Sequence, residues 1–286
     1  MHRIPLGSRT RVMGVLNCTP DSFSDPGRFL DPESARRRLH EMEEEGADWI
    51  DVGGESTRPG AELVDVEEEW RRISPVLLEA QRCGCPLPIS VDTTKAEIAR
   101  RAADLGIAII NDVSALRFEP GLAKTIVSHG LALVLMHMRG EPRTMQDDPT
   151  YDDVMAEIRT FLVDAMSRCL AAGVSREQLL VDPGIGFGKT AEHNLEILRR
   201  LPEFASLGAP LLVGASRKRF LGTILGLSAE ERLEGSRAAH AAAALGGAHV
   251  IRAHDVRATV RMVRVIDAIR LAPDAGGDRI DAPAAE

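Results

Sequence analysis

The sequence has few cysteines, few aromatic residues and no long apolar run. Its four cysteines are Cys18, Cys83, Cys85 and Cys169, and their spacing matches neither a CxxC pair nor a zinc site. No apolar stretch approaches the ~20 residues that cross a bilayer. The N-terminus also lacks the apolar segment of a secretory signal. We therefore expect a reduced, cytoplasmic protein with no membrane partner.

Composition also limits the core and the partners. Aromatic residues make up 3% of the chain and hydrophobic residues 44%, so Val, Ile, Leu and Ala must fill the core. The formal net charge is -8 and no extended basic stripe is present, which argues against nucleic acid as a main partner. The eight histidines include no HExxH motif. Any metal is therefore expected to be Mg²⁺, held by oxygen atoms and a substrate phosphate.

Eight short apolar runs alternate with helical segments. The runs span residues 11–16, 49–52, 87–91, 107–110, 131–136, 179–181, 211–213 and 249–251. Helices are expected over 31–46, 65–82, 94–105, 122–128, 151–172, 191–200 and 217–245, the last interrupted around 222–228. A final helix, capped by Asp255, should turn Ile266 and Ile269 toward the barrel.

Strands that alternate with helices form a parallel sheet, and eight repeats favour closure into a (β/α)8 TIM barrel. We expect one domain over residues 1–271 and a disordered tail, rich in Pro, Gly and Asp, over 272–286.

Each apolar run ends in polar residues that are capable of chemistry. These endings are residues 17–23, 53–59, 92–95, 111–112, 137–139, 182–188, 216–218 and 252–255. Apolar strands need no such endings to remain folded. Because the carboxyl ends of barrel strands meet at one face, the pattern predicts a single shared site there.

The segment 182–190 reads DPGIGFGKT but matches no nucleotide-binding motif. A P-loop needs Gly at position 183, which is Pro, and a dinucleotide fingerprint that starts at Gly184 needs Gly at 189, which is Lys. The run that starts at Gly214 lacks the second Gly of a nucleophile elbow, because residue 218 is Lys.

Cationic side chains follow the seventh and eighth apolar runs. They are Arg217, Lys218, Arg219, Arg252 and His254. Barrels often bind phosphate at this corner, where the forked Arg donors suit phosphate oxygens. The alternative is a solvated basic surface, and we expect Arg219 to point outward.

Asp92, Asn111 and Asp182 end three other strands. Together their acceptors and donors suit the edge of a flat heterocycle, to whose ring carbonyl Lys218 can donate. The alternative is an internal ion-pair network with Lys218 or Arg252. The loops over residues 17–27 and 53–60 are rich in turn-forming residues and suit lids that close over a site. By themselves, Cys18 and Met136 are more typical of packing than of chemistry.

Taken in this order, the motifs resemble those of the dihydropteroate synthases. The match runs from Arg11 to Arg270, and its specific pieces are residues 17–25, 53–60, 182–187, 216–218 and 252–255. The resemblance implies a barrel enzyme, of a kind targeted by sulfonamides, that joins 6-hydroxymethyl-7,8-dihydropterin diphosphate to 4-aminobenzoate. The products would be 7,8-dihydropteroate and diphosphate, in folate biosynthesis. It also implies Mg²⁺ as cofactor and a homodimer formed through helices near the sixth to eighth strands.

The resemblance also assigns residues to ligands. Those implied for the pterin are Asp92, Asn111, Asp182, Lys218, Met136 and Phe187. Those implied for the diphosphate are Asn17, which would act through Mg²⁺, Arg252 and His254. Those implied for 4-aminobenzoate are Phe23, Thr57, Arg58, Pro59 and Lys218. The residues implied for the chemistry itself are Asp92, Asp182, Lys218 and Arg252.

Two positions depart from the family pattern. Arg219 stands where some members carry Ser beside the aminobenzoate carboxylate, and Pro26 replaces a commoner Gly in the first loop. Neither change removes a residue that the chemistry needs.

Three other functions remain open from the sequence. A methyltetrahydrofolate-dependent methyltransferase would share the Asp and Asn recognition but would need neither Arg58 nor Arg252. A non-catalytic paralogue would bind pterin and regulate. A Schiff-base lyase would use Lys218, one of only four lysines, with a pKa lowered by neighbouring arginines.

Overall fold

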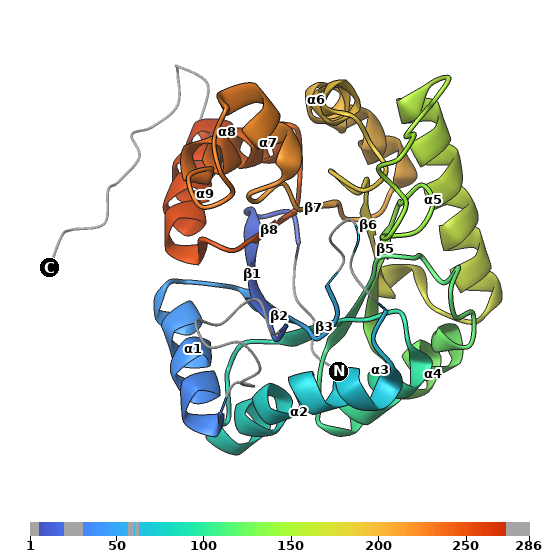
Figure 1. The fold of residues 1–286 in the computed structure, drawn as a ribbon, viewed down its shortest axis with the longest axis vertical. Helices are drawn as coiled ribbons and strands as arrows, with labels where there is room; N and C mark the ends of the chain where they lie inside the picture. Colours follow the sequence, from blue (N-terminus) through green and yellow to red (C-terminus); the bar gives the residue numbers. More distant parts are fainter. Residues whose placement is uncertain (1–5, 20–30, 57–59, 61–62, 273–286) are drawn as a thin grey trace, which may run out of the picture.

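Eight parallel strands close into a ring that helices surround (Figure 1). The computed structural model describes residues 6–19, 31–56, 60 and 63–272. The strands are β1 (Arg11–Asn17), β2 (Trp49–Gly53), β3 (Ile89–Asp92), β4 (Ile109–Asp112), β5 (Ala132–Met136), β6 (Leu179–Asp182), β7 (Leu212–Val213) and β8 (Val250–Ala253). Their order is β6-β5-β4-β3-β2-β1-β8-β7, and a single parallel bridge between Val181 and Leu211 joins the two ends. The prediction of a (β/α)8 barrel is confirmed.

The helices follow the strands as expected. They are α1 (Pro32–Glu44), α2 (Val66–Cys83), α3 (Ala96–Asp104), α4 (Leu122–His129), α5 (Val154–Ala171), α6 (Ala191–Arg199), α7 (Arg219–Leu225), α8 (Leu233–Leu245) and α9 (Val256–Leu271), with short 3-10 turns η2 (Arg176–Gln178) and η3 (Leu201–Leu207). No helix in the described part of the chain combines the length and the hydropathy that crossing a bilayer requires. The tail expected over 272–286 lies, apart from Ala272, outside the described residues.

Several local predictions need correction. Asp255 stands at the N-cap of α9, but its side chain makes no cap hydrogen bond and instead binds Arg217, with 2.7 Å between Oδ1 and Nη2. Ile266 is buried as predicted, whereas Ile269 is 60% exposed. The break between α7 and α8 begins at Gly226, whose φ of +69° ends α7, four residues later than predicted.

Strand and helix ends also shift. β3 and β4 begin two residues later than predicted and extend into the polar endings, because the ladder hydrogen bonds are made by the backbone whatever the side chain. α5 begins at Val154 rather than at Tyr151, because Asp153 accepts hydrogen bonds from the backbone N–H groups of Met155 and Ala156 and so caps the helix.

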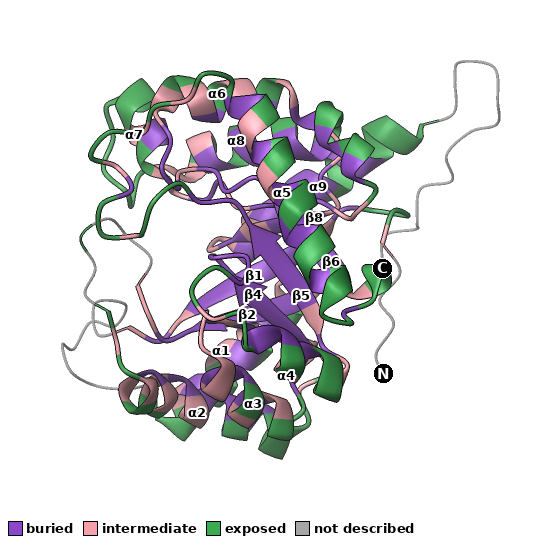
Figure 2. Ribbon diagram, turned by 90° about the vertical axis from the view of Figure 1, so that its right-hand side faces the viewer, coloured by how far each residue is buried: buried purple, intermediate pink, exposed green. Residues whose placement is uncertain are grey.

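Two of the three apolar clusters in the described residues lie along the strands of the barrel. The larger lies between the outward faces of the strands and the inner faces of the helices, whose outer faces are exposed (Figure 2). The smaller fills one end of the barrel interior and consists of Met13, Trp49, Ile109, Val134, Leu180, Leu212 and Val250. Every strand except β3 contributes one residue to this plug, which gives the interior a dry floor.

The residue two positions beyond each plug residue points into the same interior, because side chains alternate along a strand. On β2, β4, β6 and β8 these positions hold Asp51, Asn111, Asp182 and Arg252, and β3 contributes Asp92 to the same layer. The strand period therefore places a polar layer directly above the apolar floor.

The start of β1 is tied to α9 by a buried carboxylate. Asp267 accepts hydrogen bonds from the backbone N–H of Thr10 at 2.8 Å and from its hydroxyl at 2.7 Å. We expect Asp267→Ala to lower the free energy of unfolding by about 1–3 kcal/mol, since it leaves a buried donor unsatisfied. The matched control is Asp164→Ala, on the exposed face of α5. Thermal melts should show a lower Tm for the first variant alone, and equal melting temperatures would contradict the assignment.

Candidate active site

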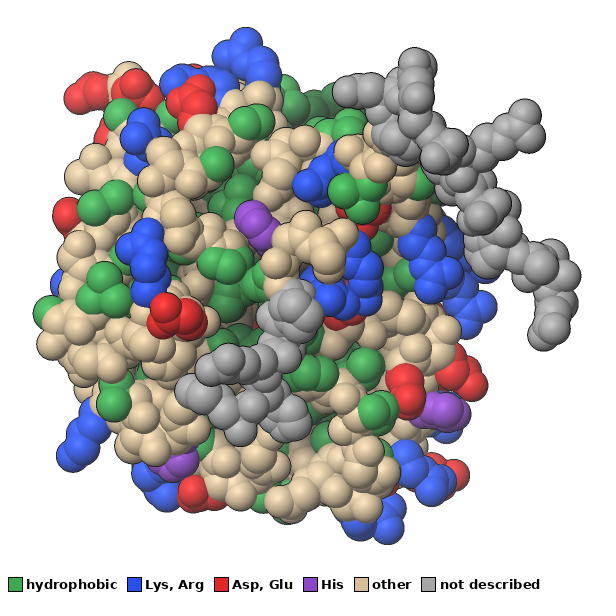
Figure 3. Space-filling model, turned by 180° about the vertical axis from the view of Figure 1, so that it is seen from behind, with side chains coloured by type: hydrophobic (Ala, Val, Ile, Leu, Met, Phe, Trp, Pro, Cys, Tyr) green, Lys and Arg blue, Asp and Glu red, His purple; other side chains and the backbone are tan. Residues whose placement is uncertain are grey.

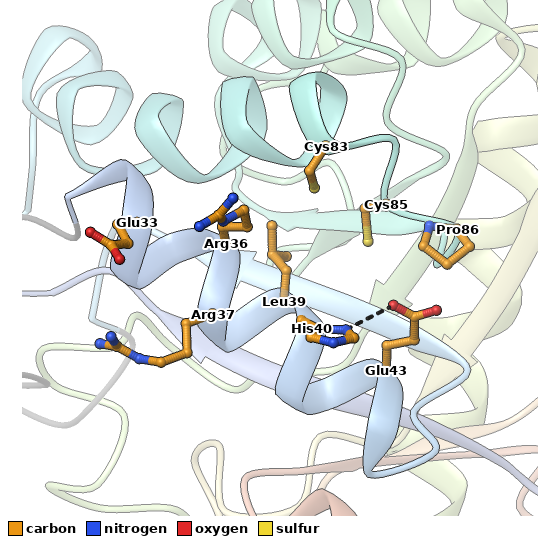
Figure 4. Close-up of a pocket in the computed structure, with 9 residues that line it drawn as sticks. All are labelled: Glu33, Arg36, Arg37, Leu39, His40, Glu43, Cys83, Cys85 and Pro86. Atoms are coloured by element: carbon orange, nitrogen blue, oxygen red, sulfur yellow. Dashed lines mark ion pairs between the residues drawn. The ribbon is translucent and has the colours of Figure 1, made fainter.

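A cavity of about 900 Å³ opens at the carboxyl ends of the strands. Its lining includes six of the predicted site residues, namely Asn17, Asp92, Phe187, Lys218, Arg252 and His254. A second hollow, of about 520 Å³, lies outside the barrel between α1 and α2, where His40 pairs with Glu43 at 3.5 Å (Figure 4). None of the predicted site residues lines this outer groove. On the face shown in Figure 3, basic and acidic side chains are interspersed rather than gathered in a stripe.

Arg252 lines the cavity and links two carboxylates. Its Nε donates to Asp51 Oδ2 at 2.6 Å, and its Nη2 donates to Asp92 Oδ2 at 2.9 Å. Asn111 Nδ2 donates to the same Asp51 oxygen at 3.1 Å. The ion-pair network considered from the sequence is therefore present. It occupies two of the five guanidinium N–H donors and leaves the others to reach a ligand.

Asp51 was missed by the sequence analysis. It is fully buried, and its Oδ1 has no hydrogen-bond partner among the described residues. A charged residue within an otherwise apolar strand, two positions after the inward-facing Trp49, was the signal that could have identified it.

The two predicted carboxylates have raised pKa values. Burial raises the pKa of Asp92 to about 7, against the opposing charge of Arg252. Burial also raises the pKa of Asp182 to about 6, although the Gly184 N–H donates to Asp182 Oδ1 at 2.7 Å. Titration near neutral pH is typical of carboxyls in functional clefts, and these two can accept hydrogen bonds from the N–H groups of a ring.

Lys218 lies across the cavity from these carboxylates, just before α7. Its ammonium stands 3.9 Å from the centre of the Phe187 ring. Burial, followed by the charge of Arg252, lowers the pKa of Lys218 to about 8. The preceding residue, Arg217, has a φ of +55° and is held by Asp255 and by the Ser236 hydroxyl. Arg217 thus fixes the turn that presents Lys218, and its charge is paired.

Burial favours the neutral form of His254. Burial, followed by the charge of Arg252, lowers its pKa to about 3, and its Nδ1 lies 3.0 Å from the Ser216 hydroxyl. The cationic corner expected from the sequence is therefore less charged than predicted. Arg219 is exposed, but it also lines the cavity, as do Lys218 and Arg252. Arg217 lines it too, with its charge paired to Asp255.

Some of the other predicted residues are described by the structure, and some are not. Asn17 ends β1 at the cavity wall. Met136 and Phe187 pack together with Val113, Met138 and Met145. Phe23, Pro26, Thr57, Arg58 and Pro59 lie outside the described residues. The ends of the second loop are anchored, because Lys95 pairs with both Glu55 and the buried Glu69, and Arg72 donates to the Gly54 carbonyl at 2.9 Å. Cys18 is buried, which raises the pKa of its thiol to about 12 and makes it unreactive.

Replacing Lys218 by Met should stabilise the protein at neutral pH, because the variant no longer buries an ammonium. The pKa of Lys218 is about 8 in the folded protein against an ordinary value of 10.5. The cost of its charge is therefore constant below about pH 8 and disappears as the pH rises toward 10.5. Thermal melts at pH 7, 8, 9 and 10 should show a gain in Tm that shrinks above pH 8.

The control for this pH series is Lys124→Met, at an exposed position of α4. It should leave Tm nearly unchanged at every pH. A Lys218→Met variant less stable than the wild type at pH 7 would contradict the assigned direction of the shift.

Comparison with known proteins places this site in a family. Residues 13–254 match the family described as pterin binding enzyme. The dihydropteroate synthase of Escherichia coli (strain K12) is 49% identical over 261 residues, which are 91% of this chain and 92% of that protein. A Yersinia pestis dihydropteroate synthase structure with a sulfonamide drug has a TM-score of 0.88 at 44% identity, covering 93% of this chain and 96% of that chain.

A Xanthomonas albilineans dihydropteroate synthase structure with 4-aminobenzoic acid has a TM-score of 0.85 at 47% identity, covering 93% of this chain and 94% of that chain. The barrel, its polar interior layer and these matches over nearly the whole length agree with one another. The chain belongs to the pterin-binding enzyme family and, within it, to the dihydropteroate synthases.

Proposed function

We propose that this chain condenses 6-hydroxymethyl-7,8-dihydropterin diphosphate with 4-aminobenzoate, giving 7,8-dihydropteroate and diphosphate for folate biosynthesis. The observation that carries the proposal is the polar layer above the barrel floor. It gathers Asp92, Asn111, Asp182 and Arg252 from four strand ends, with Lys218 opposite. An apolar floor beneath such a layer suits a flat ring that enters edge first.

The pterin would lie deepest. Asp92 and Asp182 offer acceptors for ring N–H groups, Asn111 offers an acceptor and a donor, and Lys218 offers a donor for a ring carbonyl. Phe187 and Met136 supply apolar contacts for the ring faces. We infer that the ring binds against the Asp92–Arg252 pair without separating it, because breaking a buried pair leaves an uncompensated charge.

The diphosphate would lie nearer the mouth, against Asn17, Arg252 and His254. Neutral His254 can serve as a hydrogen-bond donor through Nε2, since Nδ1 faces Ser216. Asn17 lines the cavity and offers one hard oxygen, which suits Mg²⁺. This ion usually keeps several waters and is held by one or two protein carboxylates together with substrate phosphates, so the amide oxygen of Asn17 would act beside the diphosphate oxygens. When bound there, Mg²⁺ would add positive charge beside the leaving oxygens.

The 4-aminobenzoate would bind above the pterin. Lys218 is the one residue assigned to it that the structure describes. Phe23, Thr57, Arg58 and Pro59 stay assigned by family resemblance. Arg219 begins α7 and lines the cavity. Where other members use Ser, its backbone N–H would remain for the carboxylate, and a side-chain hydroxyl contact would be lost.

The chemistry would proceed by loss of diphosphate followed by amine attack. Arg252 would stabilise the negative charge that develops on the leaving oxygen as the C–O bond breaks. The cation left on the pterin side would be delocalised into the ring and stabilised by the nearby Asp92 and Asp182 carboxylates. The lone pair of the aromatic amine would then form the C–N bond, and the amine would release its proton. No protein nucleophile is required.

We also propose a cytoplasmic location and a homodimer. All four cysteines are free thiols, which supports a reducing compartment. Ile224, Leu225 and Leu227, at and just beyond the end of α7, and Leu245 at the end of α8 are exposed apolar residues that support contact through this side of the barrel.

The direct test mixes the protein with Mg²⁺, the pterin diphosphate and 4-aminobenzoate and detects dihydropteroate by mass spectrometry. The wild type should form product, and Lys218→Ala should lose it, because the buried ammonium contacts both substrates in the proposed arrangement. Lys124→Ala is the matched control. Tight pterin binding without product would refute the synthase and favour a regulatory or methyltransferase-like pterin binder.

A substitution at Arg252 tests whether this residue acts on the diphosphate rather than on the pterin ring. An Arg252→Ala variant would strip Asp51 and Asp92 of their partner, so Arg252→Lys is the sharper probe. It keeps a cation beside both carboxylates but loses the forked donors. Turnover should fall by about a hundredfold, whereas the Kd for 6-hydroxymethyl-7,8-dihydropterin, which lacks the diphosphate, should change far less. Calorimetry and steady-state kinetics check this, and an equal loss of pterin binding would refute the assignment.

A further inference from the structure

Lys189 is the most deeply buried of the four lysines, with 3% of its surface exposed. It stands between the loop of residues 183–188, which follows β6, and Thr190, which caps α6. Among the described residues, no carboxylate lies within ion-pair distance of its amine, although the more distant charge of Asp182 acts on it and opposes the lowering of its pKa. Lysines are almost never fully buried without a charged partner, so this side chain needs an explanation.

The amine of Lys189 has three close partners. Its Nζ lies 2.9 Å from each of the Gly184 carbonyl oxygen, the Phe187 carbonyl oxygen and His137 Nδ1. An ammonium carries three donors, so the number of partners matches its capacity. Two partners belong to the loop after β6 and the third to the segment after β5. The side chain therefore closes the 183–188 loop on itself and ties it to its neighbour.

This arrangement holds whether or not the amine is protonated. Burial lowers the pKa of Lys189 far below its ordinary range, and burial with the charge of Lys189 lowers the pKa of His137 to about 2. A charged amine donates to both carbonyls and to His137. A neutral amine still donates to both carbonyls and accepts from the other histidine tautomer. The two loop carbonyls thus have a donor in either state.

Three further polar groups of this loop are bonded to side chains, while the Phe187 N–H donates to the Gly184 carbonyl at 3.1 Å. Gln146 Nε2 donates to the Gly186 carbonyl, and Tyr151 Oη donates to the Gly188 carbonyl, each at 2.7 Å. The Gly186 N–H donates to Asn194 Oδ1 at 2.7 Å. Gly184, Gly186 and Gly188 all have positive φ, between 60° and 81°. This backbone has no strand or helix to pair with, so side chains determine its path.

The path of the loop determines where two site residues stand. Gly184 donates its N–H to Asp182, and Phe187 stacks against Lys218. A Cβ on Gly186 would come within 3.0 Å of Lys218 Cδ, so the loop backbone itself touches the lysine stem. Displacement of the loop would therefore move three parts of the proposed pterin pocket together: the Asp182 acceptor, the Phe187 ring and the Lys218 donor.

Burying an amine here costs desolvation free energy, which an apolar side chain of similar size would avoid. We propose that Lys189 is a positioning residue of the synthase. By binding the Gly184 and Phe187 carbonyls, it holds the 183–188 loop so that Asp182 and Phe187 meet the pterin ring beside Lys218. This proposal rests on the proposed function. Its test reads ring binding rather than product, so a wild type that makes no dihydropteroate would refute the function and leave this test standing.

The test compares Lys189→Met with Lys124→Met, which changes an exposed lysine of α4 in the same way. Two probes are titrated well below the melting temperature: 6-hydroxymethyl-7,8-dihydropterin, and inorganic diphosphate with Mg²⁺. In Lys189→Met the Kd for the ring should rise by about tenfold to a hundredfold, the effect of losing a hydrogen bond to a charged group such as Asp182. The Kd for diphosphate should change little, because its residues lie on β1 and β8. Lys124→Met should change neither.

A second variant, Lys189→Gln, keeps two N–H donors without the charge. It should bind the ring more tightly than Lys189→Met, because at least one loop carbonyl regains a donor, and it replaces that variant in the comparison if Met prevents folding. An unchanged ring Kd in a folded variant overturns the proposal. Equal weakening of both probes also overturns it, because that result indicates a general loss of structure rather than a misplaced loop.

Discussion

The pairing of Arg252 with Asp51 and Asp92 is the interaction on which the rest of the site depends. It spans the barrel interior from β8 to β2 and β3, and Asn111 joins it from β4. Without the guanidinium, two buried carboxylates would lie side by side with no counter-charge. With it, the interior holds a polar layer above an apolar floor, with Lys218 in the wall of the cavity and the charge of Asp182 acting on Lys218. The strands place these side chains in the interior, and the charge of Arg252 compensates the negative charges of Asp51 and Asp92 there.

The site contains buried ionisable groups that lower the stability of the fold. Asp92, Asp182 and Lys218 all have pKa values displaced toward neutrality by burial, and Lys189 is buried without a carboxylate partner. Each costs stability, and the apolar packing between strands and helices must offset the sum. Such costs are typical of functional sites, where ligands rather than the fold supply the missing partners.

Much of this arrangement could be predicted from the sequence, because a barrel strand imposes a period of two. Ile109 in the floor predicts that Asn111 points into the barrel interior, and Leu180 predicts the same for Asp182. Sequence order could not separate site residues from structural ones within a polar ending. Asp112 accepts backbone N–H bonds from Ser114 and Leu116, and Arg139 pairs with Glu157 at the surface. The partners of Asp255 and Lys189 come from distant segments, so no local pattern indicates them.

The ring of strands is not equally strong all the way round. Between β6 and β7 the sheet is joined by the lone bridge of Val181 and Leu211, with the Val181 N–H donating to the Pro210 carbonyl at 2.9 Å. Asp182 lies on one side of this seam and Lys218 follows the strand on the other. A molecule that spans the seam to touch both would act as the missing cross-link of the barrel. Binding of such a molecule would then stabilise the closed ring of strands, and closure of the ring would in turn strengthen binding. The substrate would contribute to the stability of the fold for as long as it is bound.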